Sequence, residues 1–176
     1  MLKWIGCILV MTGCVGGGMV MAVRLKRRIR ILEELEVLLQ RLYGEMEYAG
    51  NDMIDILKIL QVESIYFSEL WQRIIERLER GDSVRLWEVW REETKRKTGL
   101  SPICFLGQEE QYILQEVGRA LGQTDRKTQL HMLKLHEQRL HKVVNKIRSE
   151  SQTQARVYRV VGAVSYTHLR AHETSL

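Results

Sequence analysis

The 176-residue chain contains a single proline, and runs of β-branched residues are scarce. Proline interrupts helices and β-branched runs favour strands, so both shortages indicate a helical chain. Charged residues make up 28% of the sequence and are spread throughout it, which is typical of a helical protein rather than a sheet or a disordered tail. We predict an all-α fold, a compact antiparallel bundle of about six helices with an N-terminal transmembrane helix.

Paired cysteines are also missing. The three cysteines are Cys7, Cys14 and Cys104, and no CxxC pair occurs, so neither a disulfide framework nor a zinc knuckle is predicted. Two of them lie in an apolar N-terminal run. Cys104 stands alone, and we expect a small buried residue there rather than a nucleophile.

The sequence lacks familiar catalytic and ligand motifs. The glycines at 16–18 are without the Lys-Ser/Thr of a phosphate-binding loop, and there is no GxSxG motif. Three histidines, His131, His136 and His141, follow at spacings that turn successive side chains by ~140° around a helix. We expect them to be solvated and not to share a metal. No catalytic, cofactor or metal site is predicted, and the chain is not expected to be an enzyme.

Three pairs of neighbouring glutamates are expected on solvated helix faces, because sequence neighbours point in different directions on a helix. The pairs are Glu33/Glu34, Glu92/Glu93 and Glu109/Glu110. Basic residues and tryptophans interleave at 85–91, but Glu88 and the pair at 92–93 cancel the positive field that nucleic acid requires. Neither nucleic acid nor a small-molecule substrate is a predicted partner.

An uncharged stretch extends from Trp4 to Val23. Its ~20 residues are the length that a helix needs to cross a membrane. Only Lys3 precedes it, whereas five basic residues follow: Arg24, Lys26, Arg27, Arg28 and Arg30. The positive-inside rule then places the bulk of the chain in the cytoplasm, with these flanking residues against lipid head groups. A cleaved signal peptide, the competing interpretation, would carry its positive charge before the apolar stretch.

Two glycines within this stretch, Gly13 and Gly17, stand four positions apart. Such a face of small residues would let a second transmembrane helix pack closely. Glycine is also simply common in membrane helices, and both explanations stay open.

Apolar residues recur at helical spacing along the remainder of the chain and are expected to form the core. The successive stripes are Leu32, Leu35, Leu39, Leu42, Met46 and Ala49; Ile54, Leu57 and Leu60; Phe67, Leu70, Trp71, Ile74 and Leu78; Trp87 and Trp90; Ile113, Val117 and Leu121; and Leu130, Leu133, Leu140, Val144 and Ile147.

Glycines and short polar residues predict where these helices end and begin. The expected ends are at Gly50, Gly81 and Gly122. The expected N-terminal caps are Asn51, Asp82 or Ser83, and Thr124 or Asp125. The longest loop is expected to open at Gly99, Ser101 and Pro102 and to close near Gly107.

The segment LGQTDRKTQ at 121–129 resembles the signature of the stage III sporulation protein AB family, which lies between that family's last two cytoplasmic helices. Gln154, Ala155, Tyr158 and Gly162 also match the family's run into a second membrane helix. Physically the segment is a tight corner between two helices, and we expect it to serve structure rather than binding. Its candidate residues are Leu121, Gly122, Gln123, Thr124, Asp125, Arg126 and Gln129.

The resemblance implies a six-helix domain similar to the cytoplasmic domain of the type II secretion platform protein. It further implies a place in the mother-cell membrane facing the forespore, within a channel-like complex. The implied partner is the AA component, a secretion-type ATPase, which the chain would couple to the membrane assembly. Two alternatives stay open, an inner-membrane platform protein of a secretion or pilus system and a helical membrane signalling module.

The C-terminal tail departs from the family pattern. An apolar helix begins at 157–163, but Arg170 and Glu173 follow, and a charge in the centre of a membrane helix costs ~2.5–3.5 kcal/mol. The tail VSYTHLRAHETSL resembles read-through into a sequencing adapter. We therefore divide the chain into an anchor at 1–23, a cytoplasmic domain at 24–156, the start of a truncated second transmembrane helix at 157–163, and a non-native tail at 164–176.

Overall fold

The computed structural model describes the backbone of residues 2–81, 85–96, 101–123 and 125–173, and the side chains of residues 20–81, 85–96, 101–122 and 125–153. Within these ranges every regular element is helical, which confirms the predicted all-α bundle. The elements are α1 (Leu2–Gly44), the π-helical turn η1 (Glu45–Ala49), α2 (Met53–Glu63), α3 (Ser68–Glu79), α4 (Leu86–Lys95), the 3-10 turn η2 (Pro102–Phe105), α5 (Gln108–Gln123) and α6 (Arg126–Glu173).

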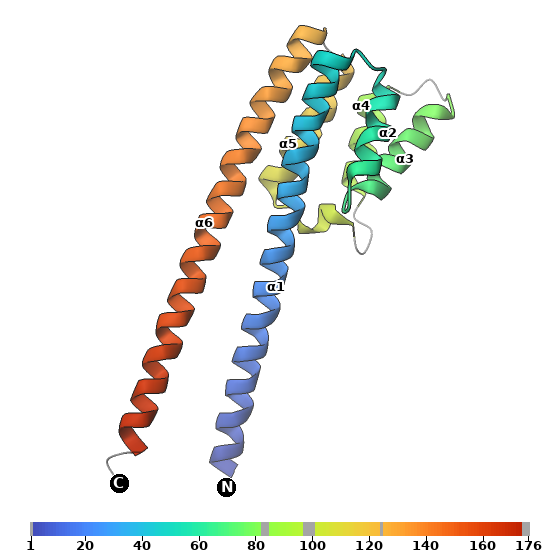
Figure 1. Cartoon of the computed structure of the whole chain (residues 1–176). Coiled ribbons are helices and arrows are strands. Elements are labelled where there is room, and N and C mark those ends of the chain that lie inside the picture. The colour runs from blue at the N-terminus through green and yellow to red at the C-terminus, as the bar shows by residue number, and fades with distance from the viewer. Residues whose placement is uncertain (1, 82–84, 97–100, 124, 174–176) are drawn as a thin grey trace.

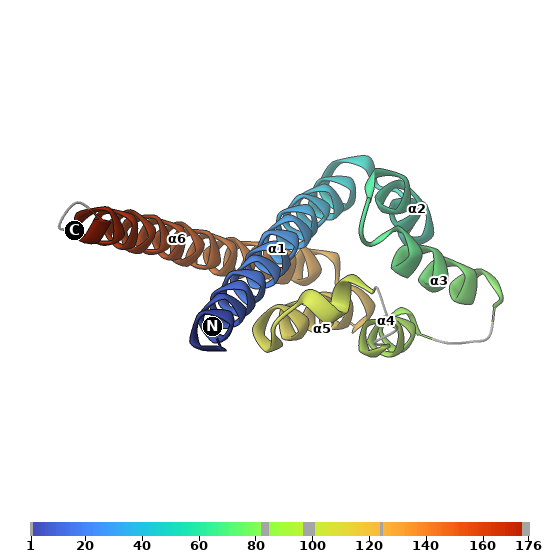
Figure 2. The same ribbon diagram turned by 90° about the horizontal axis from the view of Figure 1, so that it is seen from below.

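The two longest helices, α1 and α6, run antiparallel and contact each other along the body of the molecule (Figure 1). The shorter helices α2 to α5 pack beside them and complete that body. Both long helices continue past the body in the same direction, so the two ends of the chain lie at one end of the molecule (Figure 1). Seen from below, they separate towards the chain ends (Figure 2).

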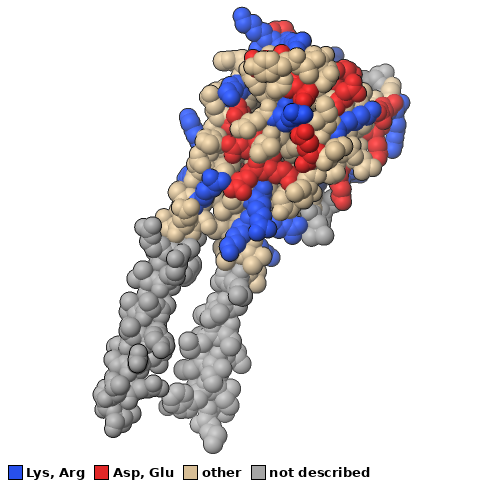
Figure 3. Space-filling model, viewed as in Figure 1, with Lys and Arg blue, Asp and Glu red and all other residues tan. Residues whose placement is uncertain are grey.

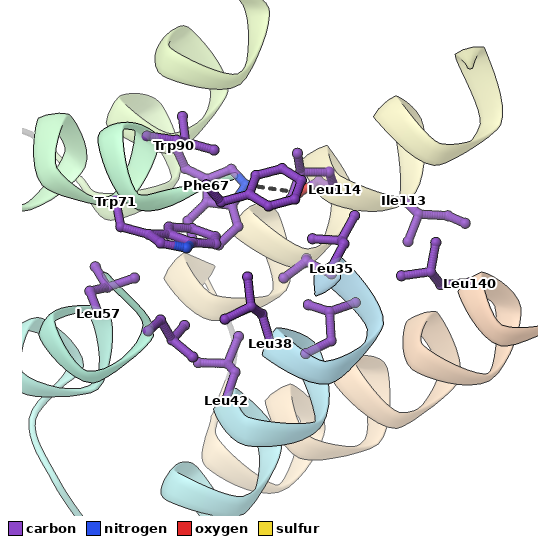
Figure 4. Packing of buried hydrophobic residues seen from close by; sticks show 14 of the residues in the cluster. Leu35, Leu38, Leu42, Leu57, Phe67, Trp71, Trp90, Ile113, Leu114 and Leu140 are labelled. Carbon is purple, nitrogen blue, oxygen red and sulfur yellow. Dashed lines mark hydrogen bonds between the residues drawn. The ribbon is translucent and has the colours of Figure 1, made fainter. Parts of the chain in front are cut away.

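Leu35, Leu38 and Leu42 of α1 belong to one buried hydrophobic cluster, which also includes Leu57 of α2, Trp71 of α3, Trp90 of α4, Ile113 of α5 and Leu140 of α6 (Figure 4). The rings of Trp71 and Trp90 lie 5.1 Å apart, and this pair joins α3 to α4. Each fully buried large side chain contributes about 1.5–3 kcal/mol by leaving water, so the aromatic pair adds several kcal/mol to a core built from many such residues.

The predicted stripes are buried or partly buried with one exception, which is Ala49. Ala49 is exposed at the end of η1. The prediction was wrong there because the wider π-helical winding shifts the phase of the stripe away from the core.

Two of the three predicted helix-ending glycines are confirmed. Gly50 and Gly81 follow η1 and α3 with positive φ angles of 65° and 72°. The prediction for Gly122 was wrong, because this residue lies inside α5 with an ordinary helical backbone. It marks a close helix contact instead, since a Cβ added there would lie 2.9 Å from the Cβ of Trp87 on α4.

The predicted caps have mixed outcomes. Asp52, not Asn51, is the N-cap of α2, so that prediction was wrong. The amide of Asn51 instead donates a hydrogen bond of 2.9 Å to Glu45 and holds the turn after η1. Within the expected loop to Gly107, Pro102–Phe105 form the turn η2. Four residues named in these predictions lie outside the described residues: Asp82, Ser83, Gly99 and Thr124.

Candidate functional site

The family-like corner between α5 and α6 is held by local hydrogen bonds. Asp125 caps α6, since its carboxylate accepts hydrogen bonds from the backbone N–H of Lys127 at 3.0 Å and of Thr128 at 3.1 Å. These bonds, with a third from the Thr128 hydroxyl, stabilise the charged form and lower the pKa of Asp125. The predicted cap is therefore confirmed at Asp125.

The same corner is tied to its surroundings by two side chains. The amide of Gln129 donates a hydrogen bond of 2.7 Å to the carbonyl of Leu121, which closes α5 onto α6. Arg126 donates to the carbonyl of Met46 and so fastens the corner to η1.

The five basic residues after the uncharged stretch divide into two groups. Arg28 donates to the buried carboxylate of Glu110 at 2.7 Å, and Arg27 stacks over the ring of Phe105 at 4.4 Å. These two contacts hold η2 and the start of α5 against α1. Three residues, Arg24, Lys26 and Arg30, are exposed. Basic side chains thus gather where α1 leaves the body (Figure 3).

The prediction that the glutamate pairs are solvated was wrong for Glu93 and Glu110, whereas Glu33 and Glu34 are both partly exposed. Glu93 is 2% exposed and binds Arg73, Arg77 and Arg96, which ties α3 to α4. Glu110 is equally buried beside Arg28. The missed signal is spacing, because each lies three positions from a core residue, Trp90 and Ile113 respectively.

The third pair contains a different arrangement. The carboxylate of Glu34 accepts hydrogen bonds from the hydroxyl of Ser64 at 2.6 Å and from the backbone N–H groups of Ile65 and Tyr66 at 3.0 and 2.8 Å. One side chain of α1 therefore holds the turn between α2 and α3. Nothing local in the sequence signals this contact, because its partners lie about thirty residues away.

Polar contacts also form a row along the outer edge of the α1–α6 contact, here called the α1–α6 seam. Its pairs are Glu33 with Arg148, Glu36 with His141, Gln40 with Glu137, and Tyr43 with Lys134. The pairs step along the two helices in opposite directions, as antiparallel neighbours must. The seam adds to core packing in setting the register of the two long helices.

The histidines do not converge. His131 and His141 are exposed, whereas His136 is 5% exposed and faces the interior. The prediction of a solvated His136 was therefore wrong. Burial lowers the pKa of His136, and Arg139 lowers it further while Glu116 opposes the shift. In the described part of the chain no three His, Cys, Asp or Glu side chains are grouped so that they could hold a metal ion.

Cys104 also differs from its prediction, because it is exposed rather than buried. It lies in η2, where the short 3-10 turn directs Ile103 into the core and leaves the next side chain outside. The apolar neighbour, and not the cysteine, fills the core position.

Within the described residues no helix is both long and apolar enough to cross a bilayer. The expected anchor at 1–23 lies mostly outside the residues whose side chains are described, as do Gly13, Gly17 and Gln123. The anchor and the packing role of the two glycines stay predictions.

Comparison with known proteins supplies the family. A family model described as stage III sporulation protein AB matches residues 3–165. The chain belongs to the stage III sporulation protein AB family. The resemblance first noted at 121–129 is thereby confirmed, and it extends over nearly the whole chain.

A solved structure named stage III sporulation protein AB has the same fold. It is 21% identical and superposes with a TM-score of 0.62, over 72% of this chain and 97% of that one. No curated protein matches the chain. For this stage III sporulation protein AB family member, the solved structure shows a shared fold over most of the chain, and the corner at 121–129 lies within the residues that the family model matches.

Proposed function

We propose that this family member is a membrane-anchored structural component of the stage III sporulation assembly. It lies in the mother-cell membrane facing the forespore, and its body couples an AA-type secretion ATPase in the cytoplasm to the membrane complex. The observation that carries this proposal is the direction of the two long helices. Both α1 and α6 leave the body at the same end, and basic side chains gather where α1 does so (Figures 1 and 3).

The membrane part of the proposal follows from sequence and geometry together. The uncharged residues from Trp4 to Val23 belong to α1, on the side where that helix has left the body. The exposed basic residues Arg24, Lys26 and Arg30 then lie at the level of lipid head groups. The body is held on the cytoplasmic side of the membrane.

The adaptor part rests on the character of the body. Charged residues of both signs are interspersed over its surface (Figure 3), which suits a protein partner better than nucleic acid. Its buried charges, such as Glu93 and Glu110, are engaged in internal ion pairs rather than directed at a substrate. We therefore assign it no catalytic role.

Recruitment of the ATPase to membranes tests the coupling. In sporulating cells that lack their own family member, this chain should return the AA-type ATPase to the membrane fraction and restore heat-resistant spores. Cells that receive an empty vector are the control. An ATPase that stays soluble while the chain is present in the membrane would contradict the coupling role.

Nucleotide turnover tests the absence of catalysis. The purified full chain should release no phosphate from ATP above the background of a mock preparation. Turnover that follows the protein through purification would contradict the adaptor function, because the motor would then lie in this chain.

A further inference from the structure

A hollow of about 410 Å³ lies at the base of the body, where α1 and α6 begin to leave it. Its apolar lining includes Leu25 of α1, Phe105 of η2 and Ile147 of α6. Its size suits part of a lipid or a small organic group. Because it lies beside the exposed basic residues, the hollow is at the level where the proposed function places head groups.

One side of the hollow carries two guanidinium groups. Arg24 is exposed and has no ion-pair partner among the described residues. Arg28 is held in place by its ion pair with Glu110, and 33% of its side chain remains exposed. A guanidinium matches the oxygens of a phosphate, so the exposed part of Arg28 and the unpaired Arg24 offer donors to one phosphodiester.

Helix α6 contributes Glu150 and Ser151 to the same lining. A carboxylate there disfavours a bare inorganic phosphate, but it accepts hydrogen bonds from hydroxyl groups. Because the carboxylate of Glu110 already pairs with Arg28, the hollow carries no large excess of positive charge, and Glu150 and Ser151 favour a phosphodiester whose head group carries hydroxyls. Met21 and Leu25 continue the apolar lining towards the end of the molecule from which the long helices emerge.

We propose that this hollow binds one anionic glycerophospholipid of the phosphatidylglycerol type. Its phosphodiester lies on Arg24 and Arg28, its glycerol head group meets Glu150 and Ser151, and its glycerol backbone rests on Leu25. The inference rests on the membrane anchoring proposed above. It adds a defined lipid site to what would otherwise be general attraction between basic residues and an anionic surface.

The exposed Cys104 lines the hollow and supplies a reporter. The full chain with Cys7→Ala and Cys14→Ala is placed in nanodiscs of phosphatidylcholine, with or without phosphatidylglycerol, and the rate of Cys104 alkylation by a maleimide is measured. Only unoccupied protein reacts, so phosphatidylglycerol at ten times its Kd should slow the reaction by about ten-fold.

Two variants with the same charge change separate a site from general electrostatics. Arg24→Gln should abolish the protection, because it removes a guanidinium that lines the hollow. Arg30→Gln should retain it, because Arg30 is exposed on the same helix but does not line the hollow. Equal loss of protection in both variants would overturn the proposal, as would protection by inorganic phosphate added to phosphatidylcholine nanodiscs.

Two different experimental outcomes distinguish a failure of the lipid site from a failure of the proposed membrane role. If alkaline carbonate extracts the chain from cell membranes, the membrane role fails and the lipid site fails with it. If the chain resists extraction but phosphatidylglycerol leaves the Cys104 rate unchanged, the lipid site alone is overturned.

Discussion

The α4–α5 contact and the α1–α6 seam hold their helices together in different ways. Between α4 and α5, Gly118 leaves room for the indole ring of Trp90, whose N–H donates to the carbonyl of Leu114 at 2.8 Å. Along the seam, exposed partners such as Glu33 and Arg148 face each other across two long helices. The α4–α5 contact is fixed by shape, whereas the register of α1 and α6 depends also on charges that salt can screen.

The largest effect on stability is expected at Gly118, where the α4–α5 contact is closest. A Cβ at this position would overlap the indole ring of Trp90, so Gly118→Ala should lower the free energy of unfolding by about 2–3 kcal/mol despite the better helix propensity of alanine. Chemical denaturation measured by circular dichroism would test this.

The matched control is Gly44→Ala. Gly44 is helical and has no atom within 4 Å of an added Cβ. The same substitution there should stabilise by up to about 1 kcal/mol. If both variants changed stability equally, close packing at Gly118 would not be the cause.

Replacing the buried His136 should change the stability by an intermediate amount, and this change should depend on pH. Neither ring nitrogen of His136 has a hydrogen-bond partner in the described structure, and burial lowers its pKa below the ordinary value of 6.5. Below that value the unfolded chain binds a proton that the folded chain resists, so stability falls as the pH decreases. His136→Leu should therefore raise the melting temperature more at pH 5.5 than at pH 8. An equal gain at the two pH values would show that protonation is not involved.

The smallest effect is expected in the seam. Glu33 and Arg148 are both well exposed, so a double-mutant cycle with Glu33→Gln and Arg148→Gln should give a coupling free energy of about 0.5 kcal/mol. That coupling should decrease at high salt, whereas the Gly118→Ala effect should not. A salt-independent coupling would remove the distinction between the two contacts.

The sequence pattern was enough to predict those features whose cause lies in neighbouring residues. The core stripes, the positive-φ glycines Gly50 and Gly81, and the Asp125 cap each depend on neighbours within one or two turns. The prediction that Gly122 ends a helix failed, because a glycine that allows two helices to approach closely looks the same in sequence as one that ends a helix. Which of the two applies is decided by Trp87 on another helix.

The candidate site was less accessible to prediction for the same reason. The five basic residues were recognisable from the sequence as a group. The sequence did not show which of them make internal contacts and which are exposed. Arg28 faces inward because Glu110, far along the chain, is buried beside it. Cys104 is exposed because Ile103 fills the core position in a turn whose phase no periodic pattern fixes.

The central claim is that the two long helices hold the body on the cytoplasmic side of a membrane. The most direct test uses the full chain with Cys7→Ala, Cys14→Ala and Cys104→Ala and a single new cysteine, Val62→Cys, at an exposed position away from the hollow. The chain should remain in the membrane pellet after an alkaline wash, and in separate samples a membrane-impermeant maleimide should label the new cysteine in inverted vesicles but not in intact cells. Labelling in intact cells, or release of the chain by the alkaline wash, would contradict the account.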